Sequence, residues 1–369
     1  MDFSFSDEQL ELRQTVRQAL ERAFPLRALR SFNEAVPAAR STMAASRWAM
    51  LAELGAPALL APEAAGGLGL RDIDLVGVLE EAGWSALPEP LLETASLAAP
   101  MLAALLPAPS AADALGELLN GKAPLAVGGI DIGPAGPSSP TTVSPDGMLR
   151  TPRVVGARDA VVYLLACLDP DSGWQLHAVR AETCTTTATP TLDPARDVAT
   201  VHWPLSSDTL LAYGVAAEAS VGVMADRAAA GSAALLNGLA DRMITLAADF
   251  ARERHQFGRP IGSFQAVKHL LANARVKLEF ARPVAYRAAW SLANAQPTVS
   301  HDASMAKAVA SEAAELAARA ALQVHGAIGY TWECDLHFFL KRTWAISKAW
   351  GDAATHRQLV LAQAGRPRF

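Results

Sequence analysis

Residues 252–269 read RERHQFGRPIGSFQAVKH and separate two long helical patterns. In the first pattern apolar residues repeat at helical spacing, at Leu235, Leu239, Met243, Leu246 and Phe250. In the second they repeat at Phe264, Val267, Leu271, Ala274 and Leu278. The glycines and proline between the stripes predict that one helix ends in a turn and another begins there. Ser263 is expected to be the N-cap of the second helix, and Pro283 is expected to kink it.

Arg254 follows Phe250 by one helical step, so its side chain is expected to face a packed surface. A buried cation needs a partner, and the planar fork of an arginine suits a phosphate or pyrophosphate. An ordinary ion pair between helices or subunits is the simpler interpretation of the spacing, and the residues alone leave both open.

A third stripe ends in a glycine-containing turn, QVHGAIGY at residues 323–330. Its apolar positions are Met305, Val309, Ala313, Leu316 and Ala320. Gln323 continues this face and is therefore expected to be buried. Gly326 and Gly329 allow a backbone to approach a ligand closely, and exposed amides in such a turn can bind phosphate oxygens. A glycine that simply ends a helix is the simpler alternative here.

Two sections precede these helices. Residues 1–122 carry helical patterns at about 48–55, 72–82 and 91–105, and Ser6 with Gln9 predicts a capping box at the first helix start. Residues 123–205 are rich in Pro, Gly, Ser and Thr, and five short runs predict a small antiparallel sandwich or barrel, at 124–127, 153–155, 160–168, 175–179 and 198–203. Residues 206–369 predict a four-helix bundle. The predicted fold class is α+β, mainly α, with these three domains in order.

Composition narrows the class of protein. The chain has 369 residues, 51% hydrophobic and 19% charged, with a net charge of −5, so it can bury a large core and lacks the charge of a general nucleic-acid binder. The three cysteines, Cys167, Cys184 and Cys334, form no CxxC pair. With no secretory signal and no apolar run long enough to span a membrane, we expect a cytoplasmic protein. The histidines show no metal-binding spacing, and Glu80 and Glu81 are expected on a solvated helix face.

Two segments together strongly resemble the C-terminal domain of acyl-CoA dehydrogenases. They are RERHQFGRPIGSFQAVKH and QVHGAIGYTWECDLHFFLKR. The segment LAELGAPALLAPEAAGGLGL at 51–70 resembles the N-terminal helical domain of that family. The order of helical, β and helical sections agrees as well, so the resemblance covers essentially the whole chain.

The resemblance implies a set of FAD contacts at a subunit interface. In the family, the residues that here are Arg254 and Phe257 contact the flavin dinucleotide of a neighbouring subunit. By the same resemblance Gln265 contacts the adenosine side, and the turn with Gln323 and Gly326 receives the pyrophosphate. Ala327 replaces the second glycine of the family's QxxGG turn. Such contacts imply FAD bound between protomers, and therefore a dimer or tetramer.

The resemblance also implies a reaction, the α,β-dehydrogenation of an acyl-CoA thioester. In the family a carboxylate removes the α-proton while the β-hydride goes to the flavin, and the electrons usually leave to an electron-transferring flavoprotein. Hydrogen bonds to the thioester carbonyl stabilise the developing charge, and desolvation raises the pKa of the base toward neutrality.

Three positions depart from the family pattern. The turn that usually carries the base aligns with residues 349–352, where Trp350 takes the place of the carboxylate. An alternative base position on the preceding helix aligns with Ala228; Asp226 is two residues away, which on a helix is about 200° around the axis. The Thr-Glu pair of the family's flavin-contacting β-domain loop is absent from the matching residues 126–138.

All three departures concern positions that in the family lie near the substrate and the flavin ring. The retained motifs are those that in the family contact the dinucleotide part of FAD. This asymmetry resembles the non-catalytic partner subunit of the α2β2 dehydrogenases that act on CoA thioesters of steroid side chains. The prediction is therefore a subunit of a heterotetramer with a paralogous chain, acting in lipid or steroid catabolism, with no catalytic residue assigned. The alternatives are a self-sufficient homotetramer whose base is Asp226 or another carboxylate, and a non-enzymatic acyl-CoA-binding or scaffold protein.

Overall fold

The computed structural model describes residues 4–144 and 147–364, and its contacts divide the chain into two compact units. The first unit combines the chain up to Ser31 with Val76–Leu87 and the chain from Ala229 onward; the second combines Phe32–Leu75 with Pro88–Ala228. Three helices have residues in both units, α2 (Leu26–Glu34), α4 (Asp72–Trp84) and α7 (Gly214–Glu253).

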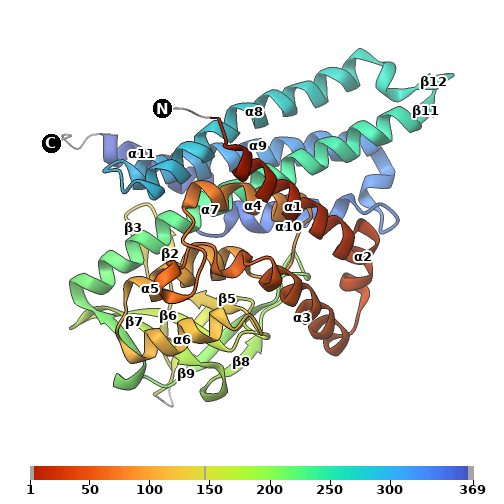
Figure 1. Cartoon of the computed structure of the whole chain (residues 1–369). Coiled ribbons are helices and arrows are strands. Elements are labelled where there is room, and N and C mark those ends of the chain that lie inside the picture. Colours follow the sequence, from red (N-terminus) through yellow and green to blue (C-terminus); the bar gives the residue numbers. More distant parts are fainter. Residues whose placement is uncertain (1–3, 145–146, 365–369) are drawn as a thin grey trace. The chain divides into compact units, whose positions relative to one another are not determined.

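The first unit is helical (Figure 1). It contains α1 (Asp7–Ala23), the larger part of α7, α8 (Gln265–Ala293), α9 (Val299–His325), α10 (Leu336–Lys348) and α11 (Ala353–Ala364). The capping box at Ser6 is confirmed, because its hydroxyl accepts from the Gln9 amide and the Gln9 side chain accepts from the Ser6 amide. Pro283 lies inside α8, which continues through it.

The α4 and α7 helices touch backbone to backbone within this unit. A Cβ added to Gly238 would lie 1.9 Å from the carbonyl oxygen of Glu80, and one added to Gly83 would lie 2.1 Å from that of Leu235. Both contacts are too close for any side chain, so these glycines are required by the crossing itself.

The buried face of α9 consists almost entirely of alanine. The predicted stripe of larger residues is only partly correct, since Met305 is 39% exposed while its neighbours Ala306 and Ala310 are fully buried. Small side chains allow α8 and α9 to pack closely. Lys307 is buried on the same face, and no apolar periodicity predicts that position.

The prediction that Glu80 and Glu81 face solvent was wrong. Both carboxylates are buried in the helical unit, at 1% and 0% exposure. Glu81 accepts from Arg13 and Arg17 at 2.6 and 2.5 Å, and Glu80 pairs with Arg13 at 2.7 Å. These arginines lie on α1 and the carboxylates lie on α4, so a buried ionic network joins the two helices. The charge pattern of either helix alone does not reveal this network.

The second unit contains two four-stranded sheets. One has the order β1-β6-β7-β10, formed by β1 (Leu125–Gly128), β6 (Val162–Asp169), β7 (Gly173–Arg180) and β10 (Leu210–Tyr213). The other has the order β4-β5-β9-β8, formed by β4 (Thr142–Val143), β5 (Leu149–Val155), β9 (Val198–Trp203) and β8 (Thr185–Ala188). The five predicted strands exist, but β1 pairs with β6 in parallel, so the purely antiparallel expectation was wrong. Tyr163 and Trp203 lie in the core beside these sheets.

The remaining helices lie in the second unit or are shared between the two units. The predicted helices near 48–55 and 72–82 correspond to α3 (Pro37–Glu53) and α4, whereas the predicted 91–105 helix begins as the π-helical segment Leu92–Ala98 and continues as α5 (Ala99–Ala104). Two helices were not predicted, α2 (Leu26–Glu34) and α6 (Pro109–Leu119). Within the part of the chain that the structure describes, no helix has the length and apolar character needed to cross a membrane.

Candidate functional site

The ends of α7 and α9 lie together in the helical unit. The rings of Phe250 and His325 stack with their centroids 4.4 Å apart and an interplanar angle of 21°. Arg254 follows Phe250 by four residues, and Gln323 and Gly326 flank His325. Two motifs separated by about seventy residues of sequence are thereby brought to one end of the helical unit.

The predicted burial of Arg254 and Gln323 was wrong, since both are exposed. The α7 helix ends at Glu253, so Arg254 no longer follows its buried stripe. At the end of α9 the buried positions are Ala321 and Val324. Gln265 is also exposed and is the first residue of α8; the N-cap is Phe264, one residue after the predicted Ser263.

Phe257 is presented to solvent by a tight hairpin. The strands β11 (His255–Gln256) and β12 (Arg259–Pro260) pair antiparallel, and the two residues between them, Phe257 and Gly258, have φ of 53° and 77°. Positive φ at both central positions is the type I′ geometry that suits a two-residue hairpin. A non-glycine residue there costs about 1 kcal/mol, and Phe257 is nevertheless 91% exposed.

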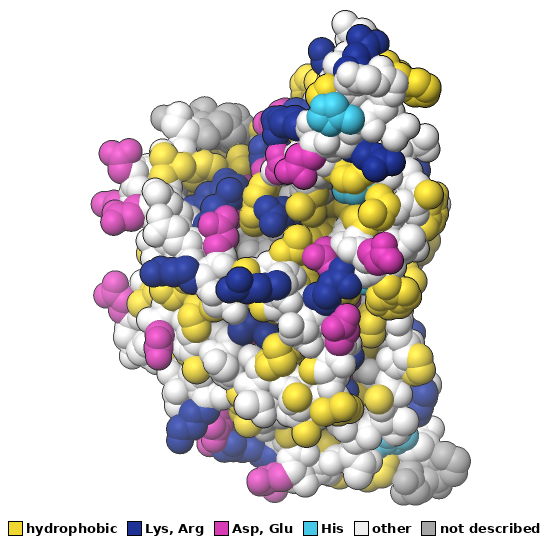
Figure 2. Space-filling model, turned by 90° about the vertical axis from the view of Figure 1, so that its right-hand side faces the viewer, with side chains coloured by type: hydrophobic (Ala, Val, Ile, Leu, Met, Phe, Trp, Pro, Cys, Tyr) yellow, Lys and Arg dark blue, Asp and Glu magenta, His cyan; other side chains and the backbone are white. Residues whose placement is uncertain are grey.

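The surface around this hairpin is basic. Arg252, Arg254 and Arg259 are exposed beside Phe257, together with His255. Figure 2 shows Lys and Arg, His and hydrophobic side chains together at this end of the molecule. An exposed aromatic ring among cationic groups is a surface that suits an anionic nucleotide.

The two glycines of the 323–330 turn have different roles. Gly326 has φ 63° and ψ −140°, and a Cβ added there would meet no atom within 4 Å, so the backbone conformation requires glycine while the space beside it is open. Gly329 is buried, and its Cβ would lie 3.0 Å from Leu322 and His325. Only Gly326 therefore matches the expectation that this turn exposes backbone to a ligand.

Trp350, expected from the resemblance at the position of the family's base, lies in the turn between α10 and α11. Its φ is 57°, and its carbonyl oxygen accepts from His356 Nε2 at 2.8 Å. The nearest carboxylate in the turn, Asp352, accepts from the Thr355 amide at 2.9 Å and thereby caps α11. This hydrogen bond lowers the pKa of Asp352, which makes it a poor proton acceptor at neutral pH.

The other candidate base position lies on the part of α7 that belongs to the second unit. Ala228 is fully buried and Asp226 is half-buried. Arg227 forms an ion pair with Asp72, which is also buried. Burial raises the pKa of Asp72, and Arg227 opposes that rise.

Residues 126–138, the segment expected to match the family's flavin-contacting loop, form part of β1 and a hairpin of β2 (Asp131–Gly133) and β3 (Gly136–Ser138). Asp131 pairs with Arg153 in this unit. A Cβ added to Gly129 would lie 1.8 Å from the Ala166 carbonyl oxygen, so this glycine serves strand packing.

The sequence matches both domain models of acyl-CoA dehydrogenase. Residues 6–108 match the N-terminal domain, and residues 219–365 match the C-terminal domain. The chain belongs to the acyl-CoA dehydrogenase family. It is 32% identical over 312 residues to the acyl-CoA dehydrogenase IpdE2 of Mycobacterium tuberculosis, covering 83% of this chain and 84% of that protein. The mainly helical fold predicted from the sequence is confirmed.

Solved structures share this acyl-CoA dehydrogenase fold. The ChsE4–ChsE5 complex of Mycobacterium tuberculosis contains a chain that matches with a TM-score of 0.84 and 23% identity over 100% of both chains. A variant of the Tcur3481–Tcur3483 steroid ACAD matches with a TM-score of 0.82 and 27% identity, covering 97% of this chain and 98% of that one.

Two side chains of this family member were missed by sequence reasoning. Lys307 is a lone cation in the alanine-rich segment SMAKAVASEAA, and Arg242 lies next to the apolar position Met243. A charged residue on an otherwise apolar helix face was the available signal in both cases.

Proposed function

We propose that this chain is one subunit of an FAD-dependent acyl-CoA dehydrogenase that carries out α,β-dehydrogenation of an acyl-CoA thioester, and that a paralogous subunit supplies the catalytic base. The observation that carries the proposal is an asymmetry. The nucleotide-side residues are exposed at one end of the helical unit, whereas the usual base position holds the indole of Trp350. By nucleotide-side residues we mean Arg254, Phe257, Gln265, Gln323 and Gly326.

The exposed residues fit FAD arriving from outside the chain. Phe257 is 91% exposed and has a strained backbone, with a positive φ. A planar ring system of the cofactor that covers its side chain would remove apolar surface from water. Arg254 offers a guanidinium fork for the pyrophosphate, Gln265 and Gln323 offer amide groups, and Gly326 leaves open space beside its backbone. We assign the FAD-holding role to these five residues.

Bound FAD would supply the acceptor for the hydride from the β-carbon. In this chain Arg254 would neutralise the nucleotide's negative charge, and Phe257 would shield part of it from water. Trp350 has no basic atom that could take the α-proton, because its indole nitrogen is a donor only. A carboxylate outside this turn is required, and the paralogous subunit is our choice for its source.

The substrate class we propose is an acyl-CoA derived from lipid or steroid breakdown, with electrons passing to an electron-transferring flavoprotein. The support is similarity to IpdE2 and to the Tcur3481–Tcur3483 steroid ACAD, together with the likeness of fold to one chain of the ChsE4–ChsE5 complex. The three cysteines are unpaired, as expected of the reducing cytoplasm in which we place the enzyme.

The test is co-expression of the chain with a paralogous acyl-CoA dehydrogenase subunit from the same organism, followed by native mass spectrometry and flavin absorbance. We expect an α2β2 complex that is yellow and is bleached by an acyl-CoA, and a chain that alone binds little flavin and shows no dehydrogenation. Stoichiometric flavin and full activity from the chain alone would establish the homotetramer instead. A complex that binds acyl-CoA but no flavin would establish a scaffold role.

A further inference from the structure

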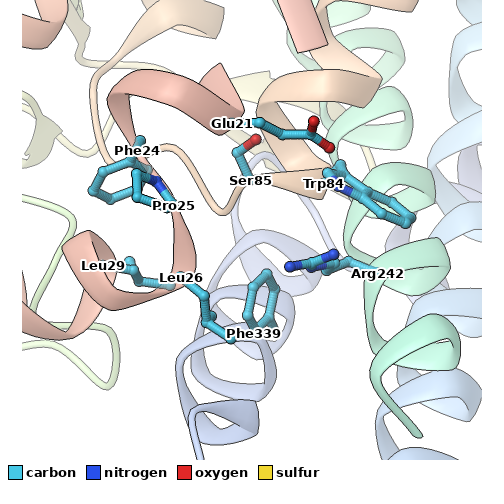
Figure 3. Close-up of a pocket in the computed structure, with 9 residues that line it drawn as sticks. All are labelled: Glu21, Phe24, Pro25, Leu26, Leu29, Trp84, Ser85, Arg242 and Phe339. Carbon is cyan, nitrogen blue, oxygen red and sulfur yellow. The ribbon is translucent and has the colours of Figure 1, made fainter. Parts of the chain in front are cut away.

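The helical unit contains a cavity of about 220 Å³ away from the nucleotide-side residues. It lies among the corner between α1 and α2, the end of α4, the middle of α7 and α10 (Figure 3). Its wall is mainly hydrophobic, with Phe24, Leu29 and Phe339 buried and Leu26 half-buried. Arg242 lies about 16 Å along α7 from Glu253, where the helix ends.

Arg242 is the cationic group of this cavity. Figure 3 shows its guanidinium directed toward the middle of the lining residues, between Phe339 and Trp84. Its carbon Cζ lies 5.0 Å from the centroid of the Trp84 ring. Among residues 4–144 and 147–364 the structure gives this guanidinium no hydrogen bond and no ion pair. Burial lowers the pKa of Arg242, which is the direction expected when the charge lacks a compensating partner.

The neighbouring charges do not neutralise Arg242. Arg17 also lies over Trp84, at 4.4 Å, but its guanidinium is bonded to Glu81. Glu21 is exposed at the edge of the cavity and attracts Arg242 only at longer range. A half-buried arginine with no bonded acceptor gains free energy when an anion supplies the missing hydrogen bonds.

We propose that this cavity binds a small carboxylate with an apolar body, such as an aromatic or short branched-chain carboxylate, with Arg242 holding the carboxylate group. A cavity of about 150 Å³ accommodates benzene, so the larger volume here has room for a ring and a carboxylate. The fork of Arg242 matches the two carboxylate oxygens, the ring of Trp84 and the aliphatic wall contact the hydrocarbon, and the Ser85 hydroxyl offers one further donor. This site is independent of the proposed flavin function.

The apolar wall selects against other anions. Inorganic phosphate would have to lose its hydration against Phe24, Leu29 and Phe339, none of which offers it a hydrogen bond. A neutral ligand of the same shape would keep the hydrophobic contacts and leave Arg242 without its partner. Both charge and an apolar body are therefore required, and each can be tested separately.

The experiment is titration of the purified full-length chain with benzoate, benzyl alcohol and inorganic phosphate, followed by ligand-observed NMR. We expect saturable benzoate binding with a Kd on the order of 0.1–1 mM, and at least tenfold weaker binding of the other two compounds. Arg242→Met should weaken benzoate binding at least tenfold. Arg252→Met, on the same helix but exposed and paired with Asp249, should leave it unchanged.

A second variant protects the test against misfolding. Leu26→Trp places a larger side chain at the half-buried rim of the cavity and should abolish benzoate binding while Arg242 remains in place. Equal benzoate affinity in the wild type and Arg242→Met, absence of saturation by 10 mM benzoate, or binding of phosphate as tight as that of benzoate would each overturn the proposal.

Discussion

Lys307 Nζ donates to the carbonyl oxygen of Ile346 at 3.0 Å, which joins the middle of α9 to the last turn of α10. Lys307 Nζ also donates to the Ser347 carbonyl oxygen at 3.1 Å and to Ser311 Oγ at 3.4 Å. Lys307 is fully buried. The group therefore holds the end of α10 at the point where the chain enters the Trp350 turn, and it contributes donors that the last carbonyls of a helix otherwise lack.

We expect the stability of the protein to depend on pH through Lys307. Burial lowers the pKa of Lys307 to about 7, whereas an unfolded lysine titrates near 10.4. Between these values the unfolded chain carries a proton that the folded chain does not, so the free energy of unfolding should rise with pH by up to about 1.4 kcal/mol per pH unit. Below pH 7 both states are protonated and the full cost of burial is present.

The measurement compares urea unfolding of the wild type and Lys307→Met from pH 6.5 to 9.5. The charged groups around Lys307, namely Asp352, Lys348, Glu315 and His356, are unchanged in the variant, so their contributions largely cancel. The difference in unfolding free energy, wild type minus variant, should increase with pH. Parallel pH profiles would show that Lys307 remains an ammonium throughout this range.

We expect Glu81→Gln to be strongly destabilising. The Glu81 carboxylate is fully buried and bonded to Arg13 and Arg17, so its neutralisation leaves Arg17 without its anion and leaves Arg13 with Glu80 alone. Breaking a buried pair in this way costs roughly 3–5 kcal/mol. Glu11→Gln, at an exposed position on α1, is the matched control and should change stability by less than about 0.5 kcal/mol. Similar midpoints for both variants in chemical unfolding would contradict the role assigned to this network.

Features encoded by local spacing were predictable from the sequence. The capping box at Ser6 and Gln9 and the bounds of the strand Val198–Trp203 depend on neighbouring residues, and the structure confirms both. The family resemblance rested on contiguous motifs and was likewise confirmed.

Features that depend on tertiary contacts were not predictable. Periodicity assigns the larger Met305 to a core face that alanine occupies, because close packing of helices favours the smallest side chains. Arg254 is exposed because α7 ends one residue earlier, at Glu253. The spacing of apolar residues does not indicate where a helix ends. The partners of Glu81 lie more than sixty residues away in sequence.

The nucleotide-side assignment predicts a separation between flavin binding and stability. Arg254→Gln should weaken FAD binding to the assembled complex by about 10- to 100-fold, the effect of losing a hydrogen bond to a charged group, without lowering the thermal midpoint of the flavin-free chain, because Arg254 is exposed. Arg252→Gln, two residues earlier and also exposed, should retain full flavin occupancy. The measurement is the absorbance ratio of flavin to protein after gel filtration. Equal flavin loss in both variants would indicate a general loss of positive charge and would remove the specific role from Arg254.

The catalytic assignment predicts that Asp226 is not the base. Asp226→Asn in the assembled complex should leave turnover with an acyl-CoA within about twofold, because the position aligned with the family's base is Ala228 and Asp226 lies about 200° away around α7. Removing a general base lowers turnover by roughly 10²-fold or more, so the two outcomes are well separated. Glu218→Gln, an exposed carboxylate on the same helix, controls for the loss of one charge. A large loss in Asp226→Asn alone, with flavin occupancy intact, would identify Asp226 as the base and favour a chain that needs no partner for its chemistry.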